Sequence, residues 1–246
     1  MALGLAILPM TSAHASSTWL VGVKASKAQL TAGQRVVFSG TVRPHGAAAG
    51  QKVVLQERFK PGKPWENQRK ATIDKSGKYR LSDRPTTNTL HAYRVVMPAT
   101  SRHAKGVSPT VKVRVYAWSA LTNHESVNRR CISVGDVKMN GAKYAKSLRA
   151  TCGYDAHLEF NLDHQCIRLR ATFGISDLST TAGQAEVDVE SDGTSVYTHT
   201  FDIGKTEAKG VALDSPLKLR LAAHSTSTYP VIGLGAFGAP EVLCTR

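Results

Sequence analysis

The chain has 246 residues, of which 41% are hydrophobic and 20% are charged, and its formal net charge is +14. This length is too great for one small domain and fits two, and the composition excludes a disordered chain because each half can bury a core. The basic balance is evidence about partners and encounter rates, and it leaves the fold open.

The positive charge lies entirely in the first half. Residues 16–120 hold 19 Lys and Arg against four acids, a net charge of +15, whereas residues 121–246 hold 13 against 14, a net charge of −1. Such a surface attracts an anionic polymer; the alternative is a basic surface that serves solubility or passive adhesion to a wall. A dedicated nucleic-acid role is disfavoured because no helix-turn-helix, zinc-finger or RNA-binding motif is visible.

Residues 1–15 have the pattern of a signal peptide. Ala2 to Met10 is apolar, and Ala13-His14-Ala15 has the small-x-small form that signal peptidase cleaves. We therefore expect a secreted or cell-wall-associated, extracellular protein whose mature chain begins near Ser16. The alternative is an ordinary hydrophobic N-terminus. No transmembrane segment is expected, because a spanning helix needs roughly 20 apolar residues.

The first half shows period-two alternation interrupted by turn signals, which is typical of short β-strands. A loop is expected at Pro44 to Gly50 and a hairpin turn at Asp74 to Gly77. Seven short strands predict an immunoglobulin-like sandwich over residues 17–117, with Trp65 and Tyr93 in its core. The expected strands are Trp19–Ala25, Arg35–Val42, Lys52–Phe59, Trp65–Ile73, Tyr79–Leu81, Ala92–Met97 and Thr110–Tyr116.

Two motifs in this half resemble the immunoglobulin-like modules of exported actinobacterial proteins. Gly33-Gln34 through Phe38-Ser39-Gly40-Thr41-Val42 is similar to the module's strand-opening motif, and Asp74-Lys75-Ser76-Gly77-Lys78-Tyr79 is similar to its hairpin. The resemblance covers the whole domain and implies its fold. It implies little about function, because such modules often act as spacers.

Alternation is clearer in the second half, residues 118–246. Ala185 to Glu190, for example, places apolar side chains on one face and acids on the other, and Asp192-Gly193 supplies a tight turn. We expect a second sandwich here. Its expected strands are Leu158–Leu162, Cys166–Phe173, Ala185–Glu190, Ser195–Phe201, Val211–Leu213, Leu217–Leu221 and Val242–Cys244.

The chain contains four cysteines, all in the second half: Cys131, Cys152, Cys166 and Cys244. An even number in an exported chain predicts two disulfides, and the lack of a CxxC spacing disfavours a zinc cluster. From the residues alone, three pairings are open.

Ordered motifs from about Lys143-Tyr144 to Cys244 resemble the novel putative carbohydrate-binding module, a galactose-binding-like jelly roll found beside glycoside hydrolases. The resemblance implies sugar binding and a disulfide between Cys166 and Cys244, which leaves Cys131 with Cys152. The matching blocks are Leu158–Leu162, Cys166 through Phe173-Gly174-Ile175-Ser176-Asp177, Val187–Val189, Asp192-Gly193, Val196-Tyr197, Ile203-Gly204 and Leu217–Leu221.

Three positions depart from the family pattern. Ala236-Phe237-Gly238-Ala239-Pro240 keeps the frame of the family's last block but replaces its tryptophan. Leu178 replaces a second acid after Asp177, and the expected loop Gly233 to Gly238 lacks acidic residues. These departures leave the fold unchanged and concern the sugar or calcium site. No cofactor is expected, and a structural calcium ion has no support in the residues.

No catalytic arrangement is visible. The sequence lacks G-x-S-x-G, H-E-x-x-H and a phosphate-binding glycine loop, and we expect no enzyme. A sugar site needs aromatic faces beside acids or amides. The structural alternatives are core packing for the tyrosines and turn capping for Asp192. The candidates are Tyr144, Tyr154, Tyr197 and Tyr229, with Asp177 and Asp192 as polar partners.

The sequence therefore predicts an all-β protein of two sandwiches that binds a polysaccharide or cell-wall glycan through its second domain. Attraction of an anionic polymer by the basic first domain would support that binding. The alternative is a structural or protein-interaction ectodomain that has lost sugar binding.

Overall fold

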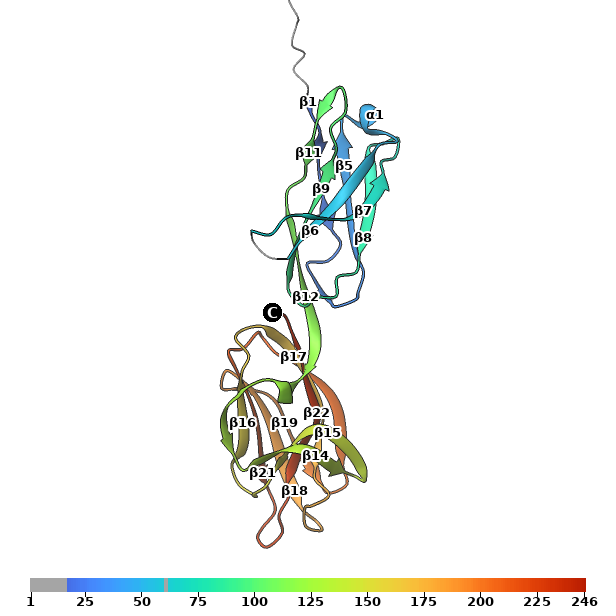
Figure 1. Cartoon of the computed structure of the whole chain (residues 1–246). Coiled ribbons are helices and arrows are strands. Elements are labelled where there is room, and N and C mark those ends of the chain that lie inside the picture. Colours follow the sequence, from blue (N-terminus) through green and yellow to red (C-terminus); the bar gives the residue numbers. More distant parts are fainter. Residues whose placement is uncertain (1–16, 60–61) are drawn as a thin grey trace, which may run out of the picture. The chain divides into compact units, whose positions relative to one another are not determined.

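A computed structural model describes residues 17–59 and 62–246, and the expected signal peptide at residues 1–15 lies outside them. The predicted all-β class is confirmed, because strands form nearly every element (Figure 1). Contacts divide the chain into two compact units, residues 1–85 with 90–113 and residues 86–89 with 114–246. Among the described residues, no helix has the length and apolar character needed to cross a membrane.

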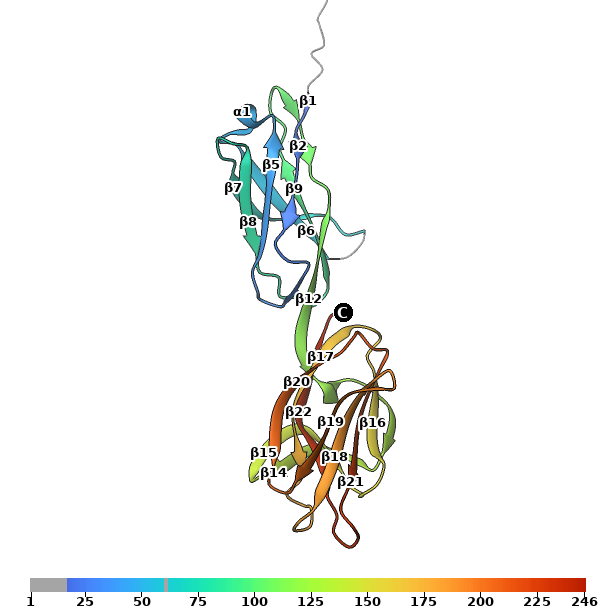
Figure 2. The ribbon, with the colours of Figure 1, turned by 180° about the vertical axis from the view of Figure 1, so that it is seen from behind.

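The first unit is a sandwich of short strands (Figure 2). One sheet has the order β12-β9-β6-β7, with β4 on β12 and β11 on β9. The other joins β2, β3 and β8 to β5, and β1 pairs with β10. The strands are β1 Ser17–Thr18, β2 Leu20–Val21, β3 Lys24–Ala25, β4 Gln29–Thr31, β5 Val36–Arg43, β6 Lys52–Arg58, β7 Glu66–Thr72, β8 Lys78–Asp83, β9 Leu90–Met97, β10 His103–Ala104, β11 Gly106–Val107 and β12 Val111–Ala120.

The core of this unit comes from the alternation seen in the sequence. In β6, Val53 and Leu55 are fully buried while the intervening side chains are half-exposed. Phe38 of β5 and Tyr93 of β9 pack with ring centroids 4.5 Å apart. Tyr93 is thus a core residue as expected, and burial of these rings supplies much of the stabilisation available to a unit without disulfides.

Three local expectations for the first unit differ from the structure. The strand expected at Trp19–Ala25 is interrupted after Val21, and the Pro44–Gly50 loop contains one helical turn, α1 His45–Ala48. Trp65 is only half-buried. Its ring packs against charged side chains, since the guanidinium carbons of Arg58 and Arg94 lie 4.6 and 4.2 Å from the ring centroid. Trp65 therefore belongs to the surface.

The second unit contains two antiparallel sheets with five strands of its own in each, and residues 117–120 of β12 also pair with β22. One has the order β13-β16-β21-β18-β19, and the other has the order β14-β15-β22-β17-β20. The short 3-10 helix η1 Leu121–Asn123 precedes them. The strands are β13 Ser126–Arg130, β14 Ile132–Met139, β15 Ala142–Ala150, β16 Ala156–Asn161, β17 Cys166–Ile175, β18 Gln184–Ser191, β19 Thr194–Asp202, β20 Thr206–Ala212, β21 Lys218–Ser225 and β22 Gly235–Cys244.

A single hydrophobic core fills the space between these sheets. It includes Phe160 of β16, Phe173 of β17 and Phe237 of β22, all at most 1% exposed. The disulfides join Cys166 to Cys244 and Cys131 to Cys152, the pairing implied by the family resemblance. The first connects residues directly opposite each other on β17 and β22, so it fixes the register of the two central strands.

The β14–β15 hairpin folds back across β22 and β17. A register shift follows Gly135, and the side chains of Met139 and Tyr144 lie over Gly238, where a Cβ atom would come within 2.7 and 2.8 Å of them. The stretch expected to be a loop at Gly233–Gly238 thus belongs largely to β22. Its small residues are buried, Ala236 and Gly238 against the hairpin and Gly235 against β18 and β21, which explains why the stretch resembles a loop in the sequence.

Candidate functional site

Three loops of the second unit lie at one end of its sandwich, here called the loop end (Figure 1). They are residues 151–155 between β15 and β16, residues 176–183 between β17 and β18, and residues 226–234 between β21 and β22. The register places them together, because Ile175 pairs with Gly235 and Ala185 pairs with Ser225. Function in a β sandwich commonly lies on such loops, held in place by the sheets.

Hydrogen bonds connect the three loops into one body. The hydroxyl of Thr180 accepts the backbone N–H of Ile232 at 2.7 Å, and the hydroxyl of Ser179 accepts that of Leu234 at 2.9 Å. The N–H of Ser225 donates to the carbonyl of Gly153 at 2.7 Å. The hydroxyl groups of these loops are therefore used largely for internal positioning.

Close backbone approach adds to this rigidity. A Cβ atom at Gly233 would lie 2.0 Å from the carbonyl oxygen of Gln184, and one at Gly183 would lie 2.8 Å from that of Ile232. Only glycine fits where backbones come so near. The loop end is thus preformed.

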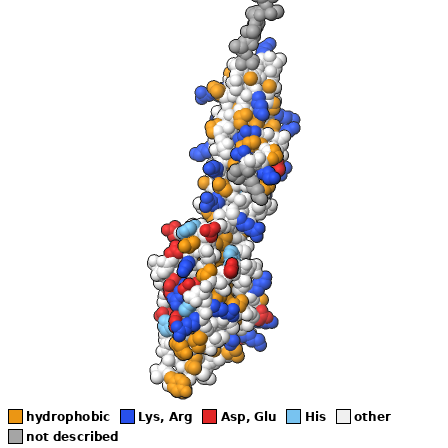
Figure 3. Space-filling view, turned by 60° about the vertical axis from the view of Figure 1, so that its left-hand side comes forward, with side chains coloured by type: hydrophobic (Ala, Val, Ile, Leu, Met, Phe, Trp, Pro, Cys, Tyr) orange, Lys and Arg blue, Asp and Glu red, His pale blue; other side chains and the backbone are white. Residues whose placement is uncertain are grey.

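Large side chains project from this preformed end into solvent. Tyr154 is 66% exposed, Leu178 is 70% exposed and Tyr229 is 86% exposed, one from each loop. Hydrophobic side chains gather at the tip of this unit in Figure 3. Exposed tyrosine rings are suitable for stacking on the apolar face of a sugar, whereas an exposed leucine serves no hydrogen bond.

Asp177 links this end to the β14–β15 hairpin. Its Oδ2 accepts the backbone N–H of Gly141 at 3.0 Å, and its own N–H donates to the carbonyl of Lys138 at 2.9 Å. Its side chain is exposed, and Oδ1 has no partner among the described residues. Asp177 therefore has one carboxylate oxygen available to accept a hydroxyl hydrogen bond.

Polar charged groups lie beside Tyr154. The Arg130 guanidinium carbon is 5.9 Å from the Tyr154 ring centroid, and Arg130 donates to Asp155 at 2.8 Å. A hydrogen bond from His157, followed by its charge and those of Arg130 and Arg220, holds the pKa of Asp155 below its usual value. Asp155 therefore remains ionised and accepts a hydrogen bond from Arg130, and this bond holds the Arg130 guanidinium next to the Tyr154 ring.

The structure does not bring the other predicted residues to the loop end. Tyr144, on β15 of the hairpin, is half-buried against the cluster that contains Met139 and Ala236. Tyr197 packs its ring on Phe173 at 4.6 Å between centroids. Asp192 lies at the opposite end of the unit, where its carboxylate accepts the N–H of Lys218 at 2.8 Å and that of Leu217 at 3.2 Å.

Tyr197 does not line the shallow cavity of about 430 Å³ formed by residues 199–202, 205–207 and 209, but it contacts one of its lining residues. Its hydroxyl donates to Glu207 at 2.7 Å. Burial and this hydrogen bond raise the pKa of Tyr197, and the same bond lowers the pKa of Glu207. Asp192 lines a separate cavity of about 530 Å³ with Val196 and Leu213.

Sequence reasoning missed Leu178 as part of the exposed surface. The sequence feature that could have identified it is its position, because an apolar residue follows Asp177 where the carbohydrate-binding module that the chain resembles has an acid. Within residues 17–59 and 62–246, no group of three or more His, Cys, Asp or Glu residues could hold a metal ion.

A search of curated proteins finds no match. Solved structures that are similar include the CBM51-2 and INT domains of Clostridium perfringens ZmpB, at 8% identity and a TM-score of 0.44. That match covers 65% of this chain and 38% of the other. Another is CBM51 from Clostridium perfringens GH95 in complex with methyl-galactose, at 15% identity and a TM-score of 0.42, covering 51% of this chain and 99% of the other.

The model of the NPCBM/NEW2 domain matches residues 104–228. This range contains two of the three exposed side chains of the loop end, Tyr154 and Leu178, together with Asp177. The matched residues make up about half of the 246-residue chain, and the chain therefore belongs to the NPCBM/NEW2 domain family.

Proposed function

We propose that the protein is a secreted, non-catalytic glycan-binding protein, in which residues 118–246 are the binding module and residues 17–117 are a basic immunoglobulin-like domain. Membership of the NPCBM/NEW2 family supports glycan binding. The observation that carries the site is the preformed loop end, whose loops expose the rings of Tyr154 and Tyr229 and a carboxylate oxygen of Asp177.

Each group has a chemical role in this proposal. The tyrosine rings would stack on the C–H face of a sugar, and Asp177 would accept a hydrogen bond from a sugar hydroxyl. Because the loops are held by hydrogen bonds such as Thr180 with Ile232, little ordering entropy would be lost on binding. The partner would be a polysaccharide or cell-wall glycan.

The first unit would add attraction for an anionic polymer. Among residues 17–59 and 62–113, no Lys or Arg lies within ion-pair distance of an acid, and the pair that does form is His91 with Glu57. In the second unit, by contrast, Arg130, Arg170 and Arg220 all have acidic partners. Uncompensated cations raise the local concentration of a polyanion in a salt-dependent way.

A glycan array with the full chain tests the loop site. Tyr229→Ala with Tyr154→Ala should reduce retention at least about tenfold, because loss of an aromatic contact costs on the order of 1 kcal/mol or more per ring. Leu217→Ala, a 41% exposed residue outside the loop end, is the matched control and should bind like the parent. Absence of retention on every glycan, with both disulfides formed and the unfolding transition intact, would contradict the proposal.

A second candidate is a structural or protein-interaction ectodomain that has lost sugar binding. Leu178 favours it, because a leucine 70% exposed at the same loop end as two exposed tyrosines is typical of a protein interface. Leu178→Asp separates the two candidates: it should abolish binding to a protein partner and change glycan retention less than the tyrosine substitutions do.

A further inference from the structure

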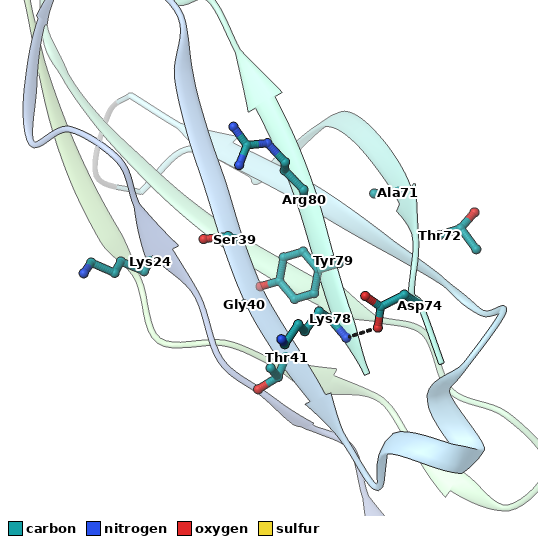
Figure 4. A pocket seen from close by; sticks show the side chains of 10 residues that line it. All are labelled: Lys24, Ser39, Gly40, Thr41, Ala71, Thr72, Asp74, Lys78, Tyr79 and Arg80. Atoms are coloured by element: carbon teal, nitrogen blue, oxygen red, sulfur yellow. Dashed lines mark hydrogen bonds between the residues drawn. The ribbon is translucent and has the colours of Figure 1, made fainter. Parts of the chain in front are cut away.

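A groove in the first unit gathers cations beside free hydroxyl groups. It has a volume of about 780 Å³ and is lined by β3, β5, β7 and β8 (Figure 4). Lys24, Lys78 and Arg80 contribute its positive charges. Asp74 contributes its one carboxylate, and Ser39, Thr41 and Thr72 contribute hydroxyls.

The strand register explains why the cations gather. Ser39 of β5 lies directly opposite Lys24 of β3 on one side and Arg80 of β8 on the other, and Thr41 lies opposite Lys78. Opposite residues of neighbouring strands share one face of the sheet. Adjacent strands are about 4.8 Å apart, so the backbones of Lys24 and Arg80 lie about 10 Å apart on either side of Ser39, and Lys78 follows on the same face of β8.

The floor of the groove depends on a glycine. A Cβ atom at Gly40 would lie 1.9 Å from the carbonyl oxygen of Gly22 and 2.6 Å from the hydroxyl of Tyr79. The Tyr79 hydroxyl donates to that same carbonyl, and its ring is buried. The groove is therefore a fixed feature of the sandwich.

One carboxylate, that of Asp74, faces the three cations and leaves the groove with a net positive charge. Its Oδ1 accepts the hydroxyl of Ser76 at 2.7 Å and the backbone N–H groups of Ser76 and Lys78 at 2.8 Å. The turn thus holds Oδ1, and these hydrogen bonds together with the charge of Lys78 lower the pKa of Asp74. Asp74 offsets part of the Lys78 charge, whereas Lys24 and Arg80 have no ion-pair partner among the described residues. Neighbouring like charges repel one another, and an anionic ligand bound between them would relieve that repulsion.

We infer that this groove binds a sulfated or phosphorylated glycan chain, through Lys24, Lys78 and Arg80 to the anionic esters and through the Ser39 and Thr41 hydroxyls to sugar oxygens. Both hydroxyls lack a partner among the described residues. The inference deepens the proposed attraction for an anionic polymer and rests on it for the choice of a glycan.

The chemistry of the groove favours a glycan over other polyanions. Single-stranded nucleic acid binds where bases stack on exposed aromatic rings, and the aromatic side chain that lines this groove, Tyr79, is 4% exposed with its hydroxyl engaged. A membrane surface is bound by exposed large apolar side chains beside basic ones, whereas no exposed large hydrophobic side chain among the described residues lines this groove.

The test measures dissociation constants of the full chain for dextran sulfate at low and physiological salt. The triple variant Lys24→Gln, Lys78→Gln, Arg80→Gln should bind at least about tenfold more weakly, with a reduced salt dependence. The matched control Lys63→Gln, Lys105→Gln, Arg102→Gln removes the same charge from exposed positions outside the groove, and should lose roughly threefold or less.

A variant that keeps the charge distinguishes specific binding in the groove from general electrostatic attraction by the basic domain. Ser39→Ala with Thr41→Val should weaken binding of dextran sulfate by roughly threefold to tenfold, because it removes two hydrogen bonds and no charge. Equal losses in the two triple variants would overturn the groove as a site. Equal or tighter binding of single-stranded DNA or of anionic phospholipid vesicles, at matched charge concentration, would overturn the glycan assignment.

The outcome is separable from that of the loop end. Tyr154→Ala with Tyr229→Ala should leave dextran sulfate binding unchanged, and the groove variants should leave retention on an uncharged glycan unchanged. If the loop proposal alone is wrong, no binding of an uncharged glycan will be measured, while dextran sulfate will still bind and still depend on the groove residues.

Discussion

The Nδ1 atom of His91 lies 2.5 Å from Oε1 of Glu57, inside the core of the first unit. Both residues are buried, at 3% and 8% exposure. The same Oε1 accepts the hydroxyl of Tyr93 at 2.8 Å, and that hydroxyl also lies 2.9 Å from Asp83 Oδ2. One carboxylate therefore organises the polar part of a core that has no disulfide.

Substitution of Glu57 should destabilise the first unit. Glu57→Gln removes the charge that His91 and Tyr93 face, and breaking a buried pair of this kind costs about 3 kcal/mol. The matched control is Glu66→Gln, which lies directly opposite Glu57 on β7 and is exposed, so its effect should stay within about 0.5 kcal/mol. Urea denaturation of both variants, followed by near-ultraviolet circular dichroism, measures the difference; equal midpoints would contradict the role assigned to Glu57.

The stability of the first unit should fall in acid. Burial raises the pKa of Glu57, but the hydrogen bonds from His91 and Tyr93 and the charge of His91 outweigh it, so the pKa is lowered from 4.5. A lowered folded-state pKa means that the stabilisation is fully present above the unfolded value and is lost as pH falls through the folded value. The urea concentration at the midpoint of unfolding should therefore decrease as the pH is lowered below about 4.5.

The acid effect has its own control. Glu57→Gln should flatten the dependence of this transition between about pH 5 and 3, because the titrating group is gone. A parent and a variant with parallel pH profiles would show that other carboxyl groups cause the loss.

The two disulfides should differ in their contribution to stability. Cys166 and Cys244 are separated by 78 residues, and Cys131 and Cys152 by 21. On the chain-entropy model, the longer loop contributes about 4.5 kcal/mol and the shorter about 3.3 kcal/mol. Double alanine variants of each pair, compared by guanidinium denaturation, should differ by roughly 1 kcal/mol; a larger loss from the 131–152 pair would contradict this order.

The loop end should tolerate no side chain at Gly233. Gly233→Ala would place a methyl group 2.0 Å from the carbonyl oxygen of Gln184, so the loop must shift or the unit must lose stability by about 2 kcal/mol. Gly135→Ala is the control, because a Cβ atom added there would have no neighbour within 4 Å. Thermal unfolding and amide chemical shifts of residues 176–183 report the two effects, and unchanged values for Gly233→Ala would exclude the close approach.

Much of the fold could be predicted from the sequence, because alternation is strong where one face of a strand is buried. The strands predicted at Leu158–Leu162 and Ala185–Glu190 correspond to β16 and β18, with the expected apolar residues inside. In β13, by contrast, all five residues of Ser126–Arg130 are exposed, so no apolar period exists to mark the strand. Hydrogen bonding to β16 defines it.

The candidate site was only half visible in the sequence. Residue type identified Tyr154, Tyr229 and Asp177, which reach the loop end, and also Tyr144 and Tyr197, which do not. Which tyrosine is exposed depends on strand register and on the path of the β14–β15 hairpin. Both are set by contacts between residues far apart in the chain, and a single sequence does not reveal them.

The groove of the first unit was invisible for a related reason. Lys24, Ser39 and Arg80 are far apart in sequence and become neighbours only through the pairing of β3, β5 and β8. Net charge alone predicted a basic domain. The position of the cations required the register.

The fold of the β14–β15 hairpin over Gly174, Ala236 and Gly238 has a consequence for comparing relatives. A bulky residue at Gly238 would meet Met139 and Tyr144, and one at Gly174 would meet the backbone of Lys205. Relatives with a shorter hairpin would be free to carry larger side chains at position 238, while those that keep its length would not. Covariation between hairpin length and residue size at that position is therefore a trace by which this architecture can be recognised in distant members.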